Sequence, residues 1–208
     1  MILAEETYLI SLDRRQERRA RALSELARAG IEKVKIFSAF DGRASGLVNP
    51  TSYSARHQNG STQMTMGEIG CYLSHLAILK MAKAKGVQSV AIFEDDIVFV
   101  SDARSRLSQF MKDVDPNWDI LHFGHMHKYV PTVMENQRVY RLNFTWCLQM
   151  MVYRKKAIEI LLSDPRTEAI LRPIDDLICL HMPQIKCYGP FPPIALQQNP
   201  LDSDLQTY

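Results

Sequence analysis

The sequence predicts an α/β protein, in which a central sheet is flanked by helices and residues 1–208 form a single domain. Short apolar runs rich in β-branched residues, typical of buried strands, alternate with longer segments whose apolar residues recur at helical spacing. The length of 208 residues suits one well-filled domain, and the chain contains no internal repeat or low-complexity tract. These observations favour one layered α/β body over a set of smaller modules.

Composition limits the classes of function. A net charge of +2 gives no argument for a nucleic-acid partner, although arginines crowd one short segment. The four cysteines lack the paired spacing of zinc sites, so we expect free thiols and a reducing compartment. The amino terminus shows no secretory signal, and no apolar stretch approaches transmembrane length. We therefore expect a cytoplasmic protein, for which peripheral contact with the inner membrane stays open.

The first elements are a strand, a helix and a second strand, within the length of one βαβ unit. Residues 7–12 are apolar and β-rich, and Asp13 is the expected helix N-cap, with Gln16 at the capping-box position. Gly30 ends the helix, and residues 34–39 form the second strand. The apolar face of the helix is expected to comprise Leu23, Leu26 and Ala27.

Arginines crowd the start of this helix, at the positive end of its dipole, namely Arg14, Arg15, Arg18 and Arg19. Cations there are disfavoured by a few tenths to about 1 kcal/mol each, a penalty that a bound anion reverses. The fork of an arginine side chain also suits phosphate geometry. A solvated basic face explains most of these residues, and we expect Arg14 and Arg18 to be the ones that face a diphosphate.

An irregular segment and a long helix follow. Residues 40–64 show no periodicity and are expected to form a flexible loop. The Thr65–Glu68 segment is a capping box that opens a helix ending near Gly86. Within it, Gly67 and Gly70 let another backbone approach closely or leave room for a ligand. The apolar stripe of this helix comprises Ile69, Tyr72, Leu73, Leu76 and Leu79.

The chain is organised around residues 90–99, an apolar run interrupted by Glu94, Asp95 and Asp96. The apolar residues before the acids predict a buried strand. Three adjacent carboxylates repel one another and are costly to bury unpaired, whereas a divalent cation at the carboxyl end of a sheet strand would neutralise them. Because such cations complete their coordination with substrate phosphates, the pattern predicts a metal–phosphate site. An acidic turn left in water explains the triplet about equally well.

The second half of the chain continues the alternation. The expected elements are a helix over 102–111, a strand over 118–124, strands over 138–146 and 148–153, and a helix from 154. Asp175 and Asp176 open a further helix, where acids are ordinary partners of the helix dipole. Residues 190–208 are proline-rich and are expected to form an extended tail. A metal cluster is disfavoured at the neighbouring histidines His122, His125 and His127, because no carboxylate or cysteine lies beside them.

Five motifs coincide in order over roughly residues 7–203. They are YLISLDRR with ERR at 8–15 and 17–19, FSAFDG at 37–42, GEIGCYLSH at 67–75, FEDD at 93–96 and PIDD at 173–176. Together they resemble the motifs of glycosyltransferase family 25, the lipooligosaccharide and procollagen galactosyltransferase group, which often also has a glutamine at the place of Gln197. The chain departs from the family pattern at Thr145-Trp146-Cys147-Leu148, where the family often has glycine and alanine.

The resemblance implies a GT-A-like, Rossmann-like nucleotide-sugar-binding fold with a mixed central sheet. It also implies transfer from a UDP-sugar with inversion, assisted by Mn²⁺ or Mg²⁺ as a Lewis acid. Asp96 is the expected metal ligand together with Glu94, and Glu94 and Asp95 are also expected to hold ribose, base or metal-bound water. The remaining expected donor contacts are Ser11, Leu12 and Asp13 at the uridine, Arg14 and Arg18 at the phosphates, and Asp41, Glu68, Ser74 and His75 elsewhere in the donor site.

Glycosyl transfer also needs a base for the acceptor hydroxyl. Asp175 and Asp176 are the candidates, and Asp175 is preferred because it aligns with the acid of the family's PxD motif. The expected function is transfer of galactose from UDP-galactose to a saccharide or lipid-linked saccharide of a lipooligosaccharide or lipopolysaccharide core. UDP-glucose or an N-acetylated sugar as donor, and a protein hydroxylysine or another glycan as acceptor, stay open. Two alternatives use the same residues, namely a metal-dependent nucleotidyltransferase or phosphohydrolase and a degenerate protein that only binds a nucleotide sugar.

Overall fold

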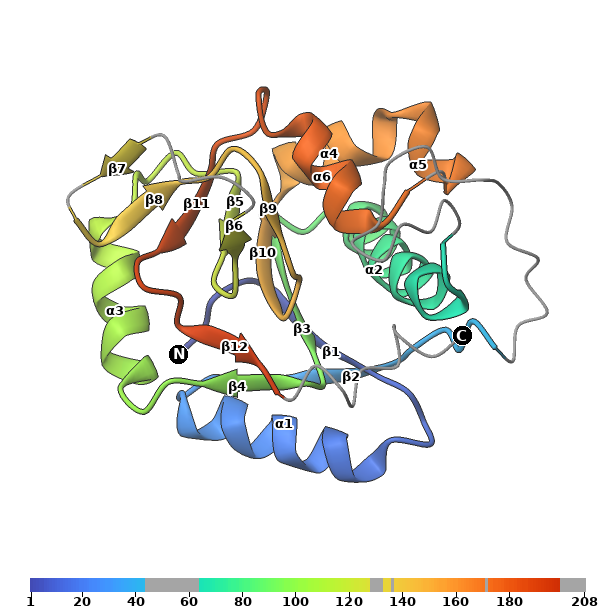
Figure 1. The fold of residues 1–208 in the computed structure, drawn as a ribbon, viewed down its shortest axis with the longest axis horizontal. Helices are drawn as coiled ribbons and strands as arrows, with labels where there is room; N and C mark the ends of the chain where they lie inside the picture. Colours follow the sequence, from blue (N-terminus) through green and yellow to red (C-terminus); the bar gives the residue numbers. More distant parts are fainter. Residues whose placement is uncertain (44–63, 128–132, 136, 171, 199–208) are drawn as a thin grey trace.

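A computed structural model describes residues 1–43, 64–127, 133–135, 137–170 and 172–198 of the chain. Its main sheet has eight strands in the order β2-β1-β3-β10-β5-β11-β8-β7 (Figure 1). The strands are β1 (Glu6–Ser11), β2 (Lys35–Ser38), β3 (Ser89–Glu94), β5 (Ile120–His122), β7 (Val133–Glu135), β8 (Val139–Arg141), β10 (Met150–Arg154) and β11 (Cys187–Pro190).

The direction of the strands decides where their ends meet. Strand β1 is parallel to β2 and β3, and β5 is parallel to β11. Strand β10 is antiparallel to both β3 and β5, so β1, β2, β3, β5 and β11 all run the same way. The carboxyl ends of these five strands therefore meet at one edge of the sheet, called here the carboxyl edge, which is where open α/β sheets bind ligands.

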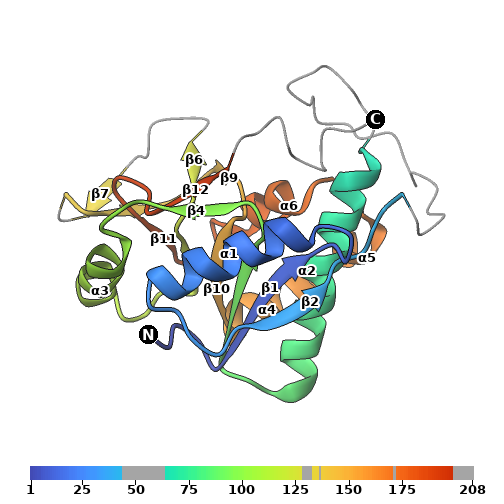
Figure 2. The same ribbon diagram turned by 90° about the horizontal axis from the view of Figure 1, so that it is seen from below.

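Helices cover both faces of the sheet (Figures 1 and 2). One layer holds α2 (Met66–Lys85), α4 (Lys155–Ser163), α5 (Pro165–Ala169) and α6 (Ile174–His181), and the other holds α1 (Gln16–Arg28) and α3 (Ala103–Asp113). Strand residues alternate between the two cores, because successive side chains point to opposite faces. Val90 and Ile92 pack against α2, α4 and α6, whereas Ala91 and Phe93 pack against α1 and α3. This mixed sheet between helices agrees with the α/β, GT-A-like fold class predicted from the sequence.

Two short strand pairs lie beside the main sheet. Strand β4 (Ile97–Phe99) pairs with β12 (Ala195–Gln197), and β6 (Met126–His127) pairs with β9 (Thr145–Trp146). The segment predicted to be extended from residue 190 contains β12, and the pairing of residues 195–197 in a sheet was not predicted. Residues 199–208 lie outside the described residues, as do residues 44–63 of the predicted loop. Within the described ranges, no helix has both the length and the apolar character needed to cross a bilayer.

The first helix differs from its prediction at its start and on its buried face. It begins at Gln16, and its N-cap residue is Arg15, with no side-chain cap. Asp13 is not the cap, because its carboxylate accepts hydrogen bonds from the Ser38 hydroxyl and the Arg19 guanidinium. The predicted face is wrong at Leu23 and Ala27, which are exposed. The buried side chains of this helix are Arg18, Ala22 and Leu26.

Other boundaries also moved. The predicted strand over 118–124 is shorter in the structure, where β5 extends from Ile120 to His122, and the predicted strand over 138–146 divides into β8 and β9. Helix α3 continues to Asp113, and Asp102 precedes it without a side-chain cap. In contrast, the Thr65 capping box is confirmed in both directions, and Gly86 ends α2 in a left-handed conformation.

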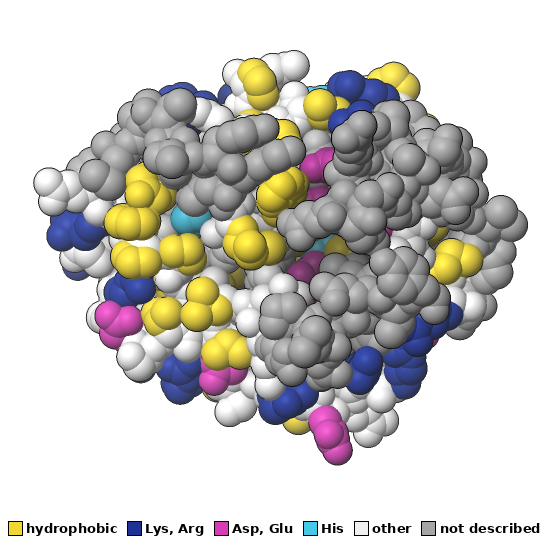
Figure 3. Space-filling model, in the orientation of Figure 1, with side chains coloured by type: hydrophobic (Ala, Val, Ile, Leu, Met, Phe, Trp, Pro, Cys, Tyr) yellow, Lys and Arg dark blue, Asp and Glu magenta, His cyan; other side chains and the backbone are white. Residues whose placement is uncertain are grey.

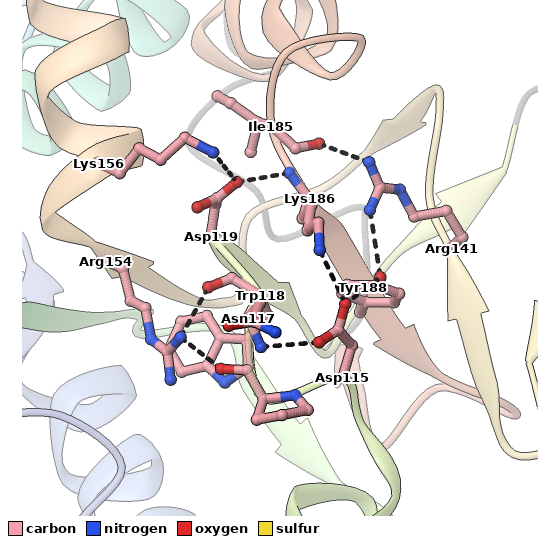
Figure 4. A network of polar contacts seen from close by, with 11 residues as sticks. Asp115, Asn117, Trp118, Asp119, Arg141, Arg154, Lys156, Ile185, Lys186 and Tyr188 are labelled. Atoms are coloured by element: carbon pink, nitrogen blue, oxygen red, sulfur yellow. Dashed lines mark hydrogen bonds and ion pairs between the residues drawn. The ribbon is translucent and has the colours of Figure 1, made fainter.

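The amino ends of the parallel strands form the other edge of the sheet, which carries a polar network (Figure 4). Arg154 stacks over the ring of Trp118 at 3.9 Å and donates to two backbone carbonyls. Asp119 accepts from Lys156 at 2.9 Å and from the backbone of Lys186 at 2.8 Å. A groove of about 850 Å³ opens here. It is lined by several of these residues and lies away from the acidic triplet, at the opposite edge.

Candidate active site

The acidic triplet lies at the carboxyl edge, as the sequence predicts. Strand β3 ends at Glu94, residues 95 and 96 form a turn, and β4 begins at Ile97. In the pairing of β1 with β3, Ile10 lies beside Glu94, so the end of β1 adjoins the acids. Because β3 is flanked on both sides by strands, its apolar residues are fully buried and the turn is held in a fixed place.

Asp96 is buried at 7% exposure, and its two carboxylate oxygens differ. Oδ2 accepts a 3.0 Å hydrogen bond from Nε2 of Gln197 on β12. Oδ1 has no hydrogen-bond partner among the described residues. Burial, and then the charge of Glu94, raise the pKa of Asp96 to about 7. An enclosed acceptor oxygen without a donor suits a cation or a hydroxyl of a ligand.

Arg18 is the cation that the structure places among these acids. Its Nη2 lies 2.7 Å from Oδ1 of Asp95 and 3.6 Å from Oδ2 of Asp96, and its side chain is 9% exposed. The prediction that Arg18 belongs to the site is consistent with this position, although the contacts shown are with carboxylates. Arg14 lies farther out and pairs with Asp41 at 3.2 Å.

Glu94 is held by two side chains of α2 that the sequence did not connect with it. Nε2 of His75 lies 3.1 Å from Oε1 of Glu94, and the thiol of Cys71 donates to the same oxygen at 3.4 Å. Burial and then Glu94 raise the pKa of the Cys71 thiol well above its usual value. The donor atoms of the three residues lie within 4.8 Å of one another, an arrangement compatible with a metal ion. The i, i+4 spacing of Cys71 and His75, which places both on one helix face, was the available signal.

The start of α2 is docked against the segment that follows β2. The hydroxyl of Ser74 accepts from the backbone N–H of Phe40 at 3.0 Å and donates to the carbonyl of Gly70. A side chain at Gly70 would overlap the carbonyl oxygen of Phe40, so the predicted close approach of another backbone is confirmed there. Glu68 closes the capping box with Thr65. The contacts of Glu68 and Ser74 with a donor remain predictions.

The end of β1 is organised by Arg19, which sequence reasoning passed over. Its guanidinium donates to the hydroxyl of buried Ser11 at 3.3 Å, to the carbonyl of Leu12 at 3.3 Å and to Asp13 at 3.1 Å. The hydrogen bond from Ser38 and then that from Arg19 lower the pKa of Asp13. The three residues predicted to line a uridine pocket are thus one connected group at the carboxyl edge.

Asp175 and Asp176 lie in the first turn of α6 and are fixed by the strand pair that contains β9. Nε1 of Trp146 donates to Oδ1 of Asp176 at 3.1 Å, and the backbone of Asp176 donates to Oδ1 of Asp175 at 2.9 Å. The backbone N–H of Cys147 also donates to Asp175. Burial, and then the charge of Asp176, raise the pKa of Asp175 to about 7, with a smaller contribution from Glu94.

Figure 3 shows acidic and histidine side chains in the middle of the face that Figure 1 presents, among hydrophobic residues. Among the described residues, Cys71, His75 and Glu94 are the group arranged to hold a metal, and His122 and His125 do not belong to it. The side chain of His127 lies outside the described part of the structure. Nε2 of His125 lies 2.7 Å from the carbonyl of Pro190, which explains its burial. All four cysteines are free thiols, as predicted.

Comparison with known proteins identifies relatives. The sequence model of glycosyltransferase family 25 (LPS biosynthesis protein) matches residues 4–163. The chain is 37% identical over 131 residues to inactive glycosyltransferase 25 family member 3 of Mus musculus, covering 58% of this chain and 22% of that protein. It is 27% identical over 191 residues to procollagen galactosyltransferase 2 of Mus musculus, covering 84% and 30%. The chain therefore spans less than a third of the length of these curated relatives.

Solved structures are less similar. A glycosyltransferase involved in the glycosylation of the major capsid of PBCV-1 aligns with a TM-score of 0.40 and 9% identity, covering 77% of this chain and 62% of that one. UDP-glucose pyrophosphorylase complexed with UDP-glucose aligns with a TM-score of 0.45 and 12% identity, covering 90% of each chain. Similarity of this extent supports no functional assignment.

Proposed function

The chain belongs to glycosyltransferase family 25, and we propose that it is a metal-dependent inverting glycosyltransferase that uses a UDP-sugar. The observation that carries the proposal is Asp96, a buried carboxylate whose Oδ1 has no donor among the described residues, next to Glu94 at the carboxyl edge. A buried carboxylate oxygen without a donor is costly unless a cation or another donor satisfies it. The second acidic pair, Asp175 and Asp176, supplies the base that transfer requires.

The residues present fit a divalent metal such as Mn²⁺ or Mg²⁺, since both prefer carboxylate oxygens. Asp96 would hold the ion through its free oxygen, and Glu94 would contribute its second oxygen, because Oε1 is already bound by His75 and Cys71. When bound, the metal would supply Lewis-acid stabilisation of the charge that develops on the leaving diphosphate. Arg18 would then pass from the carboxylates toward the phosphates.

The transfer step follows from the roles of the two acidic groups. The oxygen of an acceptor hydroxyl attacks the anomeric carbon while the bond from that carbon to the UDP oxygen breaks. The hydroxyl proton moves to the carboxylate of Asp175, and the electron pair of the broken bond leaves with UDP. Attack from the face opposite UDP inverts the anomeric centre. A pKa of about 7 suits Asp175 to the role of base, because general-base catalysis is most effective when the pKa of the base lies near the pH at which the enzyme works.

The choice of galactose as the sugar and of a lipopolysaccharide-core saccharide as the acceptor rests on the names of relatives and of the family. One relative is named a procollagen galactosyltransferase, and the family description names LPS biosynthesis. A single-domain organisation, a cytoplasmic location and peripheral membrane contact stay part of the proposal. Because another relative is named inactive, turnover by this chain is the point that most needs a test.

The test is product analysis after incubation with UDP-galactose, UDP-glucose and UDP-N-acetylglucosamine, with saccharide acceptors, in Mn²⁺ and in EDTA. The proposal predicts intact UDP and an extended saccharide, formed only with metal. UMP or sugar phosphate as the product would identify a phosphohydrolase or nucleotidyltransferase instead. Metal-dependent UDP binding without turnover of any donor would identify a degenerate nucleotide-sugar-binding protein.

A further inference from the structure

We propose that the side chain of Trp146 is the platform on which the acceptor saccharide packs, beside the Asp175–Asp176 pair. This inference rests on the proposed function and adds to it a binding subsite and the class of ligand that occupies it. It starts from the short β6–β9 pair, in which Trp146 lies opposite Met126. Trp146 is partly exposed and Met126 is 56% exposed, so this pair presents apolar surface next to the acids.

The indole of Trp146 is fixed at both ends. Its Nε1 donates a 3.1 Å hydrogen bond to Oδ1 of Asp176. Its ring meets that of Phe144 edge to face, with centroids 5.8 Å apart and an interplanar angle of 80°. An aromatic ring held in this way costs little entropy when a ligand packs on it. The ring is therefore a preorganised surface. It is bonded to Asp176, the residue next to the candidate base Asp175.

The backbone after Trp146 adds a second observation. Cys147 has a φ of 75°, in the left-handed region that L-residues rarely adopt. Its N–H donates to Asp175, while the side chain of Trp146 donates to Asp176. Two consecutive residues thus hold both acids, and the second of them has this unusual backbone conformation. Backbone strain of this kind, about 1–3 kcal/mol, persists where the surrounding structure enforces it and is common at functional sites.

The chemistry of this surface fits a saccharide better than a nucleotide. A pyranose ring offers a face of C–H groups that packs on an indole and a rim of hydroxyls that hydrogen-bond to carboxylates. Both complements are present here, since an aromatic face adjoins two carboxylates within one helical turn. A nucleotide would instead bring negative charge against Asp175 and Asp176.

The first measurement is acceptor kinetics with Trp146→Leu, Trp146→Phe and the wild type, using methyl β-galactoside, methyl β-glucoside and a hydroxylysine peptide as acceptors. Loss of the ring in Trp146→Leu should raise the KM for glycosides about tenfold or more. The KM for the UDP-sugar should stay within about twofold, because Trp146 is not among the proposed donor contacts. Trp146→Phe keeps a ring but loses the bond to Asp176, so it should lower kcat more than it raises the acceptor KM.

Trp118→Phe is the matched control, because it changes the other tryptophan of the chain, which lies at the opposite edge of the sheet. It should leave every acceptor constant unchanged. Intrinsic fluorescence gives a second readout that does not depend on turnover. Methyl β-galactoside added with UDP and Mn²⁺ should change the fluorescence of wild type and Trp118→Phe, and not that of Trp146→Phe.

The outcomes separate this inference from the proposed function. Wild type that neither binds UDP nor turns over a donor would overturn the proposed function itself. If the wild type transfers sugar and folded Trp146→Leu has an unchanged KM for the glycosides, only the Trp146 platform is overturned. Acceptance of the hydroxylysine peptide with no acceptance of either glycoside would also overturn it. Thermal unfolding and UDP binding establish that each variant is folded.

Discussion

Two carboxyl groups at the carboxyl edge, those of Asp96 and Asp175, hold their protons more tightly than free aspartate does, with pKa values raised to about 7. Burial is the main cause in both, and a neighbouring carboxylate adds to it. The folded protein therefore binds protons that the unfolded chain releases above the usual value of 3.8. Without metal, each group makes folding less favourable as the pH rises from about 4 to about 7.

Asp96→Asn removes that cost because asparagine carries no charge. In EDTA at pH 8, we expect the variant to be more stable than the wild type by on the order of 1–3 kcal/mol. The difference should shrink toward pH 4, where Asp96 is protonated in both states. Thermal unfolding across this range measures it. A variant less stable than the wild type at pH 8, or a difference independent of pH, would contradict the burial of an uncompensated carboxylate.

The ionisation of Asp175 should determine the acid limb of the pH–rate profile. A base must be ionised, so transfer should fall as the pH drops through about 7. Asp175→Asn should lose this limb and about 10²–10⁴-fold in kcat. Asp176→Asn is the matched control, since it removes the neighbouring carboxylate and should shift the limb to lower pH while retaining it. If the acid limb of the pH–rate profile survives in Asp175→Asn and disappears in Asp176→Asn, Asp176 is the base and Asp175 is the neighbouring carboxylate.

His75 should act on the metal through Glu94. His75→Leu removes the 3.1 Å contact with Oε1 and should weaken Mn²⁺ binding about 10–100-fold, the usual effect of losing a partner of a ligating carboxylate. His75→Gln keeps an N–H donor and should lose less. His181→Gln is the control, because His181 bonds Asp164 rather than the acidic triplet. Equal Mn²⁺ affinity in wild type and His75→Leu, measured by calorimetry, would exclude this role.

At this scale the sequence predicted the acids but not what surrounds them. The sequence of residues 90–99 shows directly that three adjacent carboxylates follow an apolar run. It does not show the partners of Asp96 and Glu94, because Gln197 and His75 reach these acids from elements that lie elsewhere in the chain. A histidine inside a helix is usually a satisfied core residue, and only the fold shows that its partner is Glu94.

At the scale of elements, α2 connects the acids to the segment after β2. Ser74 and Gly70 dock its start on Phe40, and the residues directly after them, His75 and Cys71, hold Glu94. A shift of this helix would therefore move Glu94. The capping box and the left-handed Gly86 that bound the helix are local features, which is why the sequence predicted both ends correctly.

Gly70→Ala tests the docking of α2. Alanine is favoured over glycine inside a helix by about 1 kcal/mol, yet its Cβ would overlap the carbonyl oxygen of Phe40. We expect a net loss of stability of about 1–3 kcal/mol, because a packed backbone must move. Ala84→Gly, at an exposed position of the same helix, measures the propensity difference alone. Denaturant unfolding of both variants gives the values, and a stabilised Gly70→Ala would contradict the close approach.

The first helix shows why other local predictions failed. Asp13 has the right residue type and place for an N-cap, but Ser38 and Arg19 engage its carboxylate. Arg18 was expected to face a diphosphate, whereas the structure shows it buried against Asp95, on the same face of the helix as Ala22 and Leu26. Tertiary partners decided both outcomes, and helical periodicity alone contains no information about them.

At the scale of the whole molecule, the sheet brings the residues of the candidate site together. Five strands run in one direction and bring the ends of β1 and β3 to one edge, while α6 and β9 add the second acidic pair. The sequence predicted the α/β class, because each buried strand is an apolar run. It did not predict the strand order, since pairing between β10, β5 and β11 joins segments that no local pattern relates.

The central claim is that the carboxyl edge is a metal-dependent UDP site built on Asp96. Its most direct test is calorimetric titration of UDP into wild type, Asp96→Asn and Asp175→Asn, each in Mn²⁺ and in EDTA. We predict binding to wild type and to Asp175→Asn in Mn²⁺, and no binding to Asp96→Asn or to any of the three proteins in EDTA. Equal UDP affinity in EDTA, or in Asp96→Asn with Mn²⁺, would contradict the claim.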